Sequence, residues 1–480
     1  MPKLAIAAIA SFVLLTSAAH AADITASRQT AASAQARAGE AEFRALYQEL
    51  VEINTTLSVG SCTKAAEAMA ARLKAAGFAN SDLQVIVPAD RPLAGNLVAY
   101  LPGSDQSLKP LLLLAHIDVV EANRADWQRD PFTLVEEGGF FYGRGSSDDK
   151  AMAAVFTDSM VRFKRDGYKP RRGIKLALTC GEETPNVFNG VKYLIENHRE
   201  LVDAAFALNE GGGGRYDQAT GVYRFVAVLA AEKLYQDFTL TTVNQGGHSS
   251  RPTPDNAIYQ LAHALEKIEQ HSFPIEFNDT TRGYFAKFGD IEGGQQGADM
   301  VAAPNGDAAA IERLRKDPSM NAILHTNCVA TQLAGGHAPN ALPQRATANV
   351  NCRIMPGHDP AKIREELIAA IGDPGVKVEF QSPPETPGAP PPLSKEVLGP
   401  IEALSKDMFP GVAVIPTMSS GATDGRFFTP AGIPTYGVSG MLGDGATGNA
   451  HGLNERIRVQ SLLEGREFLY RLAKLYARGR

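Results

Sequence analysis

The feature of this sequence that most constrains its fold is a set of three short apolar runs in the first half. The runs cover residues 111–115, 174–180 and 204–208, and they show little alternation of polar and apolar side chains. Such runs are typical of strands buried on both faces of a parallel sheet. A helical segment at 151–165, ended by Gly167, lies between two of them. The pattern predicts an α/β fold with a mostly parallel sheet flanked by helices.

A second pattern begins near Glu232, where alternating strands replace the continuous apolar runs. The expected elements are a strand at 236–243, a helix at 254–270 entered through Thr253, strands at 328–333 and 345–354, a helix at 360–371 and a strand at 376–380. The order βαββαβ predicts a small ferredoxin-like α+β unit. An insertion at 278–321, rich in Gly, Ala and Asp, separates its first helix from its second strand.

A proline-rich segment at 382–392 follows, and the chain then returns to α/β-like sequence that ends in an amphipathic helix at 459–478. A chain of 480 residues exceeds what one core usually organises, so two domains are expected. We therefore predict a discontinuous catalytic domain, residues 22–231 and 383–480, with a second domain inserted at 232–382.

The first 21 residues have the pattern of a signal peptide. One lysine precedes a run of small and apolar residues, and Ala19-His20-Ala21 supplies the small-x-small sequence that signal peptidase reads. The run is too short and too rich in alanine for a comfortable membrane anchor. No later stretch is apolar enough to cross a membrane. We expect cleavage after Ala21 and a periplasmic or secreted protein with no membrane segment.

Charge and cysteine content narrow the possible partners. A net charge of −6 over this length, without a basic patch, argues against nucleic acid and favours a small molecule or peptide. Four scattered cysteines are too few for a disulfide scaffold, although an oxidising compartment would allow a bridge. Cys328 and Cys352 lie in neighbouring strand-like segments, so they can either pair or remain free. None has zinc-knuckle spacing, so histidines and carboxylates must hold any metal.

Chemically active side chains follow each apolar run. The carboxyl ends of the strands in an open α/β sheet meet at one edge, where ligands bind. The residues expected there are His116, Asp118, Asp148, Asp149, Glu182, Glu183, Glu210 and, from a late loop, His451. An uncompensated cluster of acids would repel itself, and a bound cation is the natural neutraliser. One imidazole and one carboxylate for each metal, with a bridging carboxylate, fit two zinc ions.

These residues belong to an ordered set of motifs. The set is His116-x-Asp118, Trp127-x-x-Asp130-Pro131-Phe132, Gly143-Arg144-Gly145-Ser146-Ser147-Asp148-Asp149-Lys150, Glu182-Glu183, Gly247-His248-Ser249-Ser250 and His451. It resembles the dizinc metallopeptidase family M20, which includes glutamate carboxypeptidase, aminoacylase, carnosinase and succinyl-diaminopimelate desuccinylase. The resemblance covers nearly the whole chain after the signal peptide, and the inserted domain falls where that family has its lid and dimerisation domain.

The resemblance implies a role for each residue. Asp148 would bridge two zinc ions, with His116 and Glu210 completing one site and Glu183 and His451 the other. Asp118 would accept the second ring N–H of His116. Glu182 would be the general base for a dizinc-activated water, and the Asp148-Asp149 peptide bond would be cis.

The resemblance also implies partners. His248 would stabilise the oxyanion, often across a homodimer formed by the lid domains. Asn340, Arg353 and the loop at Gly421 fall where the family holds the substrate carboxylate, and an arginine fork suits that task. The other interpretations are a turn asparagine, a surface arginine and a plain loop. Cobalt or manganese could replace zinc.

The predicted function is hydrolysis of a peptide or amide bond in small peptides or N-acyl amino acids. Carboxypeptidase, dipeptidase and deacylase activities use the same site and remain open. A catalytically inactive relative acting as a binding protein is the alternative, but every expected position holds a competent residue. A single-metal hydrolase would leave Asp148 without a bridging purpose.

Overall fold

The computed structural model describes residues 38–184, 187–217, 219–444 and 448–479. The predicted signal peptide, residues 1–21, lies outside these ranges. Within them, no helix is both long enough and apolar enough to cross a membrane.

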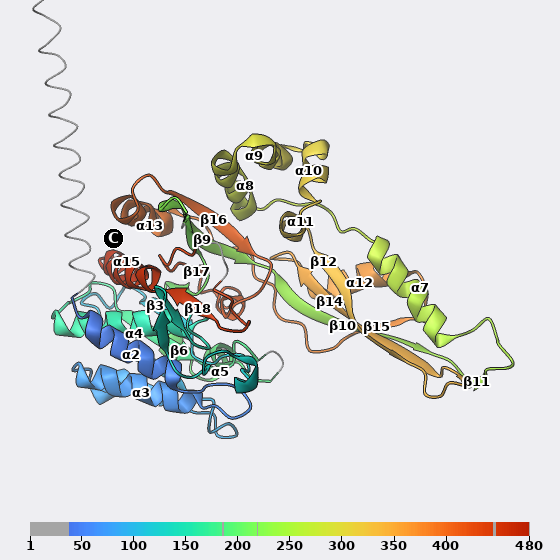
Figure 1. The fold of residues 1–480 in the computed structure, drawn as a ribbon, viewed down its shortest axis with the longest axis horizontal. Coiled ribbons are helices and arrows are strands. Elements are labelled where there is room, and N and C mark those ends of the chain that lie inside the picture. The colour runs from blue at the N-terminus through green and yellow to red at the C-terminus, as the bar shows by residue number, and fades with distance from the viewer. Residues whose placement is uncertain (1–37, 185–186, 218, 445–447, 480) are drawn as a thin grey trace, which may run out of the picture.

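A large mixed sheet forms the centre of the molecule (Figure 1). Its strands run in the order β1-β2-β6-β3-β7-β17-β9-β16, with β8 beside β9. Their bounds are β1 Leu83–Ile86, β2 Asn96–Leu101, β3 Leu111–His116, β6 Ile174–Thr179, β7 Phe206–Asn209, β8 Gly213–Asp217, β9 Val222–Glu232, β16 Ala413–Ser419 and β17 Thr435–Gly437. β3 pairs in parallel with both β6 and β7, and β7 pairs in parallel with β17. The predicted parallel strands are therefore confirmed, while strands such as β1 and β2 pair antiparallel.

Helices cover both faces of this sheet because its central strands are buried on both sides. The larger core lies under α2 Glu40–Glu52, α3 Cys62–Ala75, α4 Lys150–Arg165, α13 Lys395–Met408 and α15 Val459–Ala477. The opposite core lies under α5 Gly190–Asn197, α6 Arg199–Val202 and α14 Gly425–Phe428. Leu111 and Leu113 of β3 belong to the first core, and Leu112 and Leu114 belong to the second.

A second, four-stranded antiparallel sheet follows Lys233, the single residue between β9 and β10. Its elements are β10 Leu234–Val243, α7 Ala257–Gln270, β12 Asn327–Gly335, β14 Arg345–Ile354, α12 Pro360–Ile371 and β15 Lys377–Phe380. The strand order β12-β14-β10-β15 with two helices is the ferredoxin-like arrangement that the sequence predicted. The predicted entry of α7 through Thr253 was wrong, because the side chain of Asn256 caps this helix.

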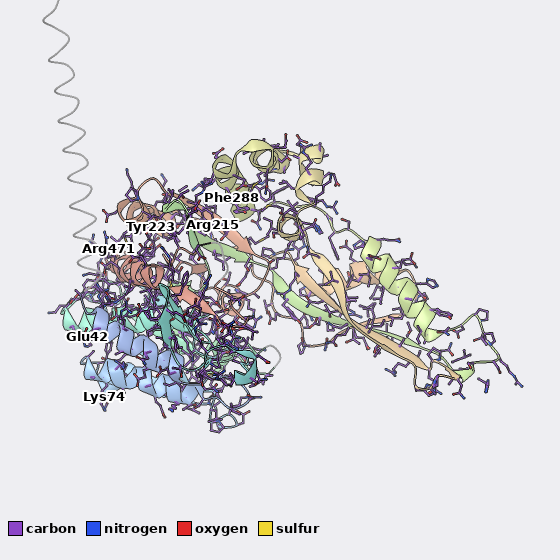
Figure 2. The ribbon with its side chains drawn as sticks, in the orientation of Figure 1. Glu42, Lys74, Arg215, Tyr223, Phe288 and Arg471 are labelled. Carbon is purple, nitrogen blue, oxygen red and sulfur yellow. A yellow bond between two sulfur atoms is a disulfide. The ribbon has the colours of Figure 1, made fainter. Side chains whose placement is uncertain are left out.

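The insertion at 278–321 forms a small helical layer that sequence patterns did not predict. Its helices are α8 Asp279–Glu292, α9 Gly294–Ala302, the 3-10 turn η3 Ala303–Asn305, α10 Ala308–Leu314 and α11 Pro318–Leu324, which share a core around Phe285. In Figure 2, Phe288 lies where α8 meets the large sheet, and its ring packs edge-on against Phe225 at 5.4 Å. Lys287 Nζ also donates to the backbone oxygen of Val414, so α8 covers the edge strand β16.

Two small sheets complete the fold. One joins β4 Val135–Glu137, β5 Phe140–Tyr142 and β18 Arg456–Arg458, and the other pairs β11 Gly247–His248 with β13 Ala341–Leu342. The pair β11–β13 lies at the end of the four-stranded unit that points away from the large sheet (Figure 1). The remaining 3-10 turns are η1 Asn80–Asp82 and η2 Arg124–Asp126.

Two disulfides link the described cysteines. Cys328 and Cys352 pair across neighbouring strands β12 and β14, which settles the open question from the sequence. Cys62 and Cys180 form a second bridge, which the sequence did not predict because 118 residues separate them. This bridge joins the first residue of α3 to the residue that follows β6.

We expect the two disulfides to differ in their effect on stability. Loop-closure entropy rises with loop length, so replacing Cys62 and Cys180 by serine should lower the free energy of unfolding by up to about 5 kcal/mol. The Cys328→Ser, Cys352→Ser protein is the matched control, because that bridge closes a loop of only 24 residues. Its loss should cost up to roughly 3.5 kcal/mol. Urea unfolding of both proteins measures the difference, and a larger loss for the second pair would contradict this order.

Candidate active site

The ends of three parallel strands deliver the predicted side chains to one place. His116 is the last residue of β3, Glu182 and Glu183 follow β6, and Glu210 follows β7. Asp148 lies in the loop that leads into α4. Because β6, β3 and β7 are adjacent and parallel, their carboxyl ends meet at the same edge of the sheet.

Asp148 lies between two histidines that come from distant parts of the chain. Its Oδ1 atom is 3.1 Å from His116 Nε2, and its Oδ2 atom is 3.2 Å from His451 Nε2. Each histidine also has a second carboxylate, since His116 Nε2 is 3.6 Å from Glu210 and His451 Nε2 is 2.9 Å from Glu183. The structure therefore contains two imidazole-carboxylate pairs that share one aspartate.

The acids around Asp148 favour their protonated forms when only the protein surrounds them. Burial and the nearby Glu210 raise the pKa of Glu182 to about 9. Burial also raises the pKa values of Glu183 and Glu210. Burial opposes ionisation of Asp148 as well, but hydrogen bonds with both histidines bring its pKa below the ordinary value.

The two histidines favour their charged forms for the complementary reason. Hydrogen bonds with Asp148 and Glu183 raise the pKa of His451 to about 10. Burial works against the charge on His116, yet the carboxylates of Glu210 and Asp148 raise its pKa well above the ordinary value. Without a metal, both histidines therefore tend to stay protonated and positively charged beside the carboxylates.

The donor set fits metal ions that accept nitrogen and oxygen ligands. Among the described residues, two groups have ligand atoms close enough to hold an ion: His116 with Asp148 and Glu183, and His116 with Asp149 and Glu210. The second group contains Asp149 in place of Asp148. Only Asp148 directs one oxygen to each histidine, so it suits the shared position better. Imidazole and carboxylate ligands suit zinc, cobalt and manganese.

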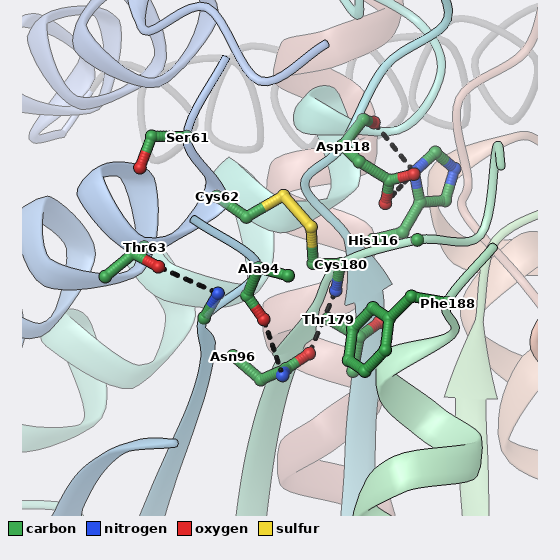
Figure 3. The surroundings of a disulfide bond; sticks show 12 residues. Ser61, Cys62, Thr63, Ala94, Asn96, His116, Asp118, Thr179, Cys180 and Phe188 are labelled. Atoms are coloured by element: carbon green, nitrogen blue, oxygen red, sulfur yellow. Dashed lines mark hydrogen bonds and ion pairs between the residues drawn. A yellow bond between two sulfur atoms is a disulfide. The ribbon is translucent and has the colours of Figure 1, made fainter. Parts of the chain in front are cut away.

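Asp118 fixes the loop that carries Glu182 and Glu183. Its carboxylate accepts the backbone N–H groups of these two residues at 3.3 and 3.0 Å. His116 Nδ1 hydrogen-bonds to the backbone oxygen of Asp118 at 3.1 Å, while Asp118 Oδ1 is 3.7 Å away (Figure 3). The expected acceptor was the carboxylate, but that group is occupied by the loop. The ring of His116 is still held with Nε2 toward Asp148.

Glu455 is a positioning residue that sequence reasoning did not single out. Its fully buried carboxylate accepts the backbone N–H groups of Gly145, Ser147 and Asp148, and it pairs with Arg144 at 2.7 Å. Arg144 also donates to the backbone oxygen of Gly452, next to His451. Glu455 therefore ties the Asp148 loop to the His451 loop. The sequence signal that could have identified Glu455 is its position four residues after the candidate ligand His451.

The peptide bond between Asp148 and Asp149 is cis, as the resemblance implied. The Gly421 loop also lies close to the cluster. It follows β16, and within it Asp424 accepts hydrogen bonds from Thr179 and Asn189, which flank the Glu182 loop.

The remaining predicted residues lie in two different places. Arg353 is near the base of the four-stranded unit, where its guanidinium lies 4.7 Å from the ring of Tyr235. No carboxylate of the described residues lies within ion-pair distance of it. His248 and Asn340 lie together at the far tip, where Ser249 N–H donates to the backbone oxygen of Asn340 (Figure 1). Within one chain, the structure does not bring them to Asp148.

Fold and site together indicate an α/β protein with a candidate metal site at the carboxyl ends of its parallel strands. Comparison with known proteins gives the family. The chain belongs to the peptidase family M20/M25/M40, whose sequence model matches residues 112–475. The resemblance seen in the motifs is thereby confirmed.

Individual relatives differ in what their names describe. The protein N-fatty-acyl-amino acid synthase/hydrolase PM20D1 of Xenopus tropicalis is 31% identical over 367 residues, 75% of this chain and 71% of that protein. The metallo-carboxypeptidase Sso-CP2 of Sulfolobus solfataricus has a TM-score of 0.67 at 20% identity, covering 91% of this chain and 99% of that chain. The YXEP protein of Bacillus subtilis, described as a dinuclear metal binding peptidase, has a TM-score of 0.59 at 11% identity, covering 91% and 98%. The two structural matches show the fold alone.

We expect Glu455→Gln to weaken metal binding without changing any ligand. The amide loses the ion pair with Arg144 and can no longer accept all the N–H groups that hold the Asp148 loop. Metal affinity should fall 10- to 100-fold, the usual effect of losing a residue that orients ligands. Titration with a competing chelator measures this change. Glu379→Gln, at an exposed position of β15, is the control, and equal affinities in both variants would contradict the assigned role.

We also expect the metal-free protein to lose stability as pH rises from about 5 to 9. Carboxyl groups such as Glu182 bind protons in the folded state up to a pKa of about 9, whereas the unfolded chain releases them near 4.5. The raised pKa of His451 acts in the same direction, because that stability is present below pH 6.5 and is lost toward pH 10. Thermal unfolding across this range measures the trend. Metal should flatten it, and a rising Tm in metal-free protein would contradict it.

Proposed function

We propose that this protein hydrolyses the amide bond of N-acyl amino acids with two zinc ions bridged by Asp148. The observation that carries the proposal is the pair of carboxylate oxygens of Asp148, each facing a different histidine with its own second carboxylate. His116 and Glu210 serve one ion, and Glu183 and His451 serve the other. Cobalt or manganese can take the same ligands.

Glu182 is the general base of this site. Zinc ions held by these ligands would polarise the scissile carbonyl and acidify a water molecule. The Glu182 carboxylate accepts a proton from the attacking water as the water oxygen bonds to the carbonyl carbon. Glu182 then gives the proton to the nitrogen of the leaving amine as the C–N bond breaks, which yields a carboxylic acid and an amine. Its backbone is held by Asp118, while the neighbouring Glu183 pairs with His451.

The four-stranded unit, within the predicted inserted domain 232–382, acts as lid and dimerisation domain. His248 is exposed, and its Nδ1 accepts the N–H of Ser250, which leaves Nε2–H available to donate to an oxyanion. Because His248 and Asn340 lie far from Asp148 in their own chain, they serve the site of a partner chain (Figure 1). The edge strand β12 exposes Val329 and Leu333 by 57% and 70%, and it is available to pair with a second copy.

Arg353 and the Gly421 loop receive the substrate carboxylate. The guanidinium of Arg353 is partly buried against Tyr235, and burial lowers its pKa, with a smaller contribution from the charge of Arg426. Since no described carboxylate forms an ion pair with Arg353, its guanidinium is available to a substrate carboxylate. The substrate therefore carries a free carboxylate on its leaving side.

We propose deacylase activity ahead of peptidase activity because the Xenopus tropicalis relative is named for N-fatty-acyl amino acids. Carboxypeptidase activity on small peptides is the second candidate, since the Sulfolobus solfataricus structure carries that name. Both reactions release an amino acid with a free carboxylate. Secretion or export to the periplasm agrees with the two disulfides, which persist in oxidising compartments.

Replacing Glu182 by Gln should keep both metals and nearly abolish turnover. The amide has the size of the carboxylate but cannot take the proton of water, so kcat should fall at least 100-fold. Metal analysis and kinetics with N-acyl amino acids and dipeptides test this together. Glu379→Gln is again the control. Wild-type turnover by Glu182→Gln, with both metals present, would disprove the mechanism.

Mixing two inactive variants tests whether His248 acts across a dimer. A chain with Glu182→Gln still supplies His248, and a chain with His248→Ala still supplies Glu182. Random reassociation should therefore restore about a quarter of wild-type activity, since half of the dimers hold one complete site of two. Activity after co-refolding measures this. No recovery in a confirmed mixed dimer would contradict a contribution from the partner.

A further inference from the structure

We infer that an apolar cavity beside the catalytic loop is the binding site for the acyl chain of the substrate. This inference rests on the proposed amidohydrolase function and specifies which part of the substrate lies on which side of the loop. The cavity measures ≈ 270 Å³ and opens to the surface. It would take a hydrocarbon chain attached to the carbonyl that is cleaved.

The walls of the cavity come from three segments that meet around a disulfide. Leu57 belongs to the loop after α2, Leu93 and Ala94 precede β2, and Phe188 follows the catalytic loop. The floor includes the Cys62–Cys180 bridge (Figure 3). Carbon and sulfur atoms thus form most of a surface that a hydrocarbon chain can contact.

The cavity borders the loop that carries Glu182 and Glu183. Gly181 and Thr184 line it, and these residues directly flank Glu182 and Glu183. Asp118, which holds the backbone of this loop, lines it as well. A group in the cavity therefore lies against the residues that flank Glu182 and Glu183.

A second cavity borders the same loop and is lined by different residues elsewhere. It measures ≈ 390 Å³ and shares Gly181, Thr184 and Phe188 with the first. Its remaining lining carries charged groups of both signs, the basic Lys192 and Arg426 and the acidic Glu196 and Glu385. Arg426 Nε lies 3.8 Å from Glu385. A substrate carboxylate in this cavity would lie beside Lys192 and Arg426, which leaves the cavity lined by Leu57 and Leu93 for the acyl side of the amide.

Exposed leucines support an apolar occupant. Leu57 and Leu93 line the cavity, and their exposed fractions are 57% and 56%. Val59, in the same loop as Leu57, is 77% exposed. Covering large apolar side chains is favourable, and a bound hydrocarbon chain would cover those that line the cavity.

A series of N-acyl derivatives of one amino acid, from acetyl to palmitoyl, tests the inference in the zinc-loaded enzyme. If the chain enters the cavity, kcat/KM rises about fourfold for each added methylene until the cavity is full. Ala94→Phe places a ring in the wall, so it should lower kcat/KM at least tenfold for octanoyl and longer chains. The acetyl substrate should stay within twofold of the wild-type value.

Two substitutions at exposed positions provide a second test in case Ala94→Phe does not fold. Leu57→Asp should lower kcat/KM for long chains selectively, because it introduces a charge at the mouth. Val222→Asp is the matched control, since Val222 is 51% exposed and does not line the cavity. It should leave the chain-length dependence unchanged.

The outcomes separate this inference from the proposed function. A flat dependence on chain length, or equal losses for Leu57→Asp and Val222→Asp, overturns the acyl site while hydrolysis itself remains. Absence of hydrolysis for every derivative, including acetyl, overturns the proposed function instead. The acyl site is supported if kcat/KM rises steeply with chain length and if Ala94→Phe or Leu57→Asp reduces this rise for long chains.

Discussion

Mutual repulsion among partly buried carboxylates is the constraint on which the rest of this structure depends. Asp148, Glu182, Glu183 and Glu210 lie together at the ends of buried parallel strands, with two histidines between them. Without a metal, the negative charge is reduced by protons that stay on the carboxyl groups, in agreement with the raised pKa of Glu182. Bound cations would balance the charge instead and leave the carboxylates deprotonated, so that they could act as ligands and as a base. This arrangement agrees with membership of the peptidase family M20/M25/M40.

Holding such a cluster requires rigid support from residues that do not bind metal. Asp118 fixes the backbone of the Glu182 loop, and Glu455 fixes the loops of Asp148 and His451 together. The Cys62–Cys180 bridge adds a covalent link at Cys180, just before the Glu182 loop. The same bridge forms the floor of the apolar cavity. The segments that support the catalytic loop thus also line the cavity that we infer to bind the acyl chain.

Sequence patterns predicted the parts of the fold that depend on local signals. Residues 111–115 became β3 because a continuous apolar run can be buried on both faces, and the bounds of β14 and α12 matched their predictions. Helices α8–α11 were missed because a segment rich in Gly, Ala and Asp shows no clear apolar face. Cys62–Cys180 and Glu455 were missed because their partners are distant in sequence, so only the folded chain reveals them. The structure brings the predicted metal ligands His116, Asp148, Glu183, Glu210 and His451 together. The position of His248 at the far tip could not be predicted, because it depends on how the second sheet extends.

Titration of the metal-free protein with zinc, followed by calorimetry and metal analysis, tests the central claim most directly. A site in which Asp148 bridges two ions predicts saturation at two zinc equivalents per chain, with release of protons from the carboxyl and imidazole groups as the ions bind. Proton release is read from the heats in buffers of different ionisation enthalpy. Saturation at one equivalent in a fully active preparation would contradict the account.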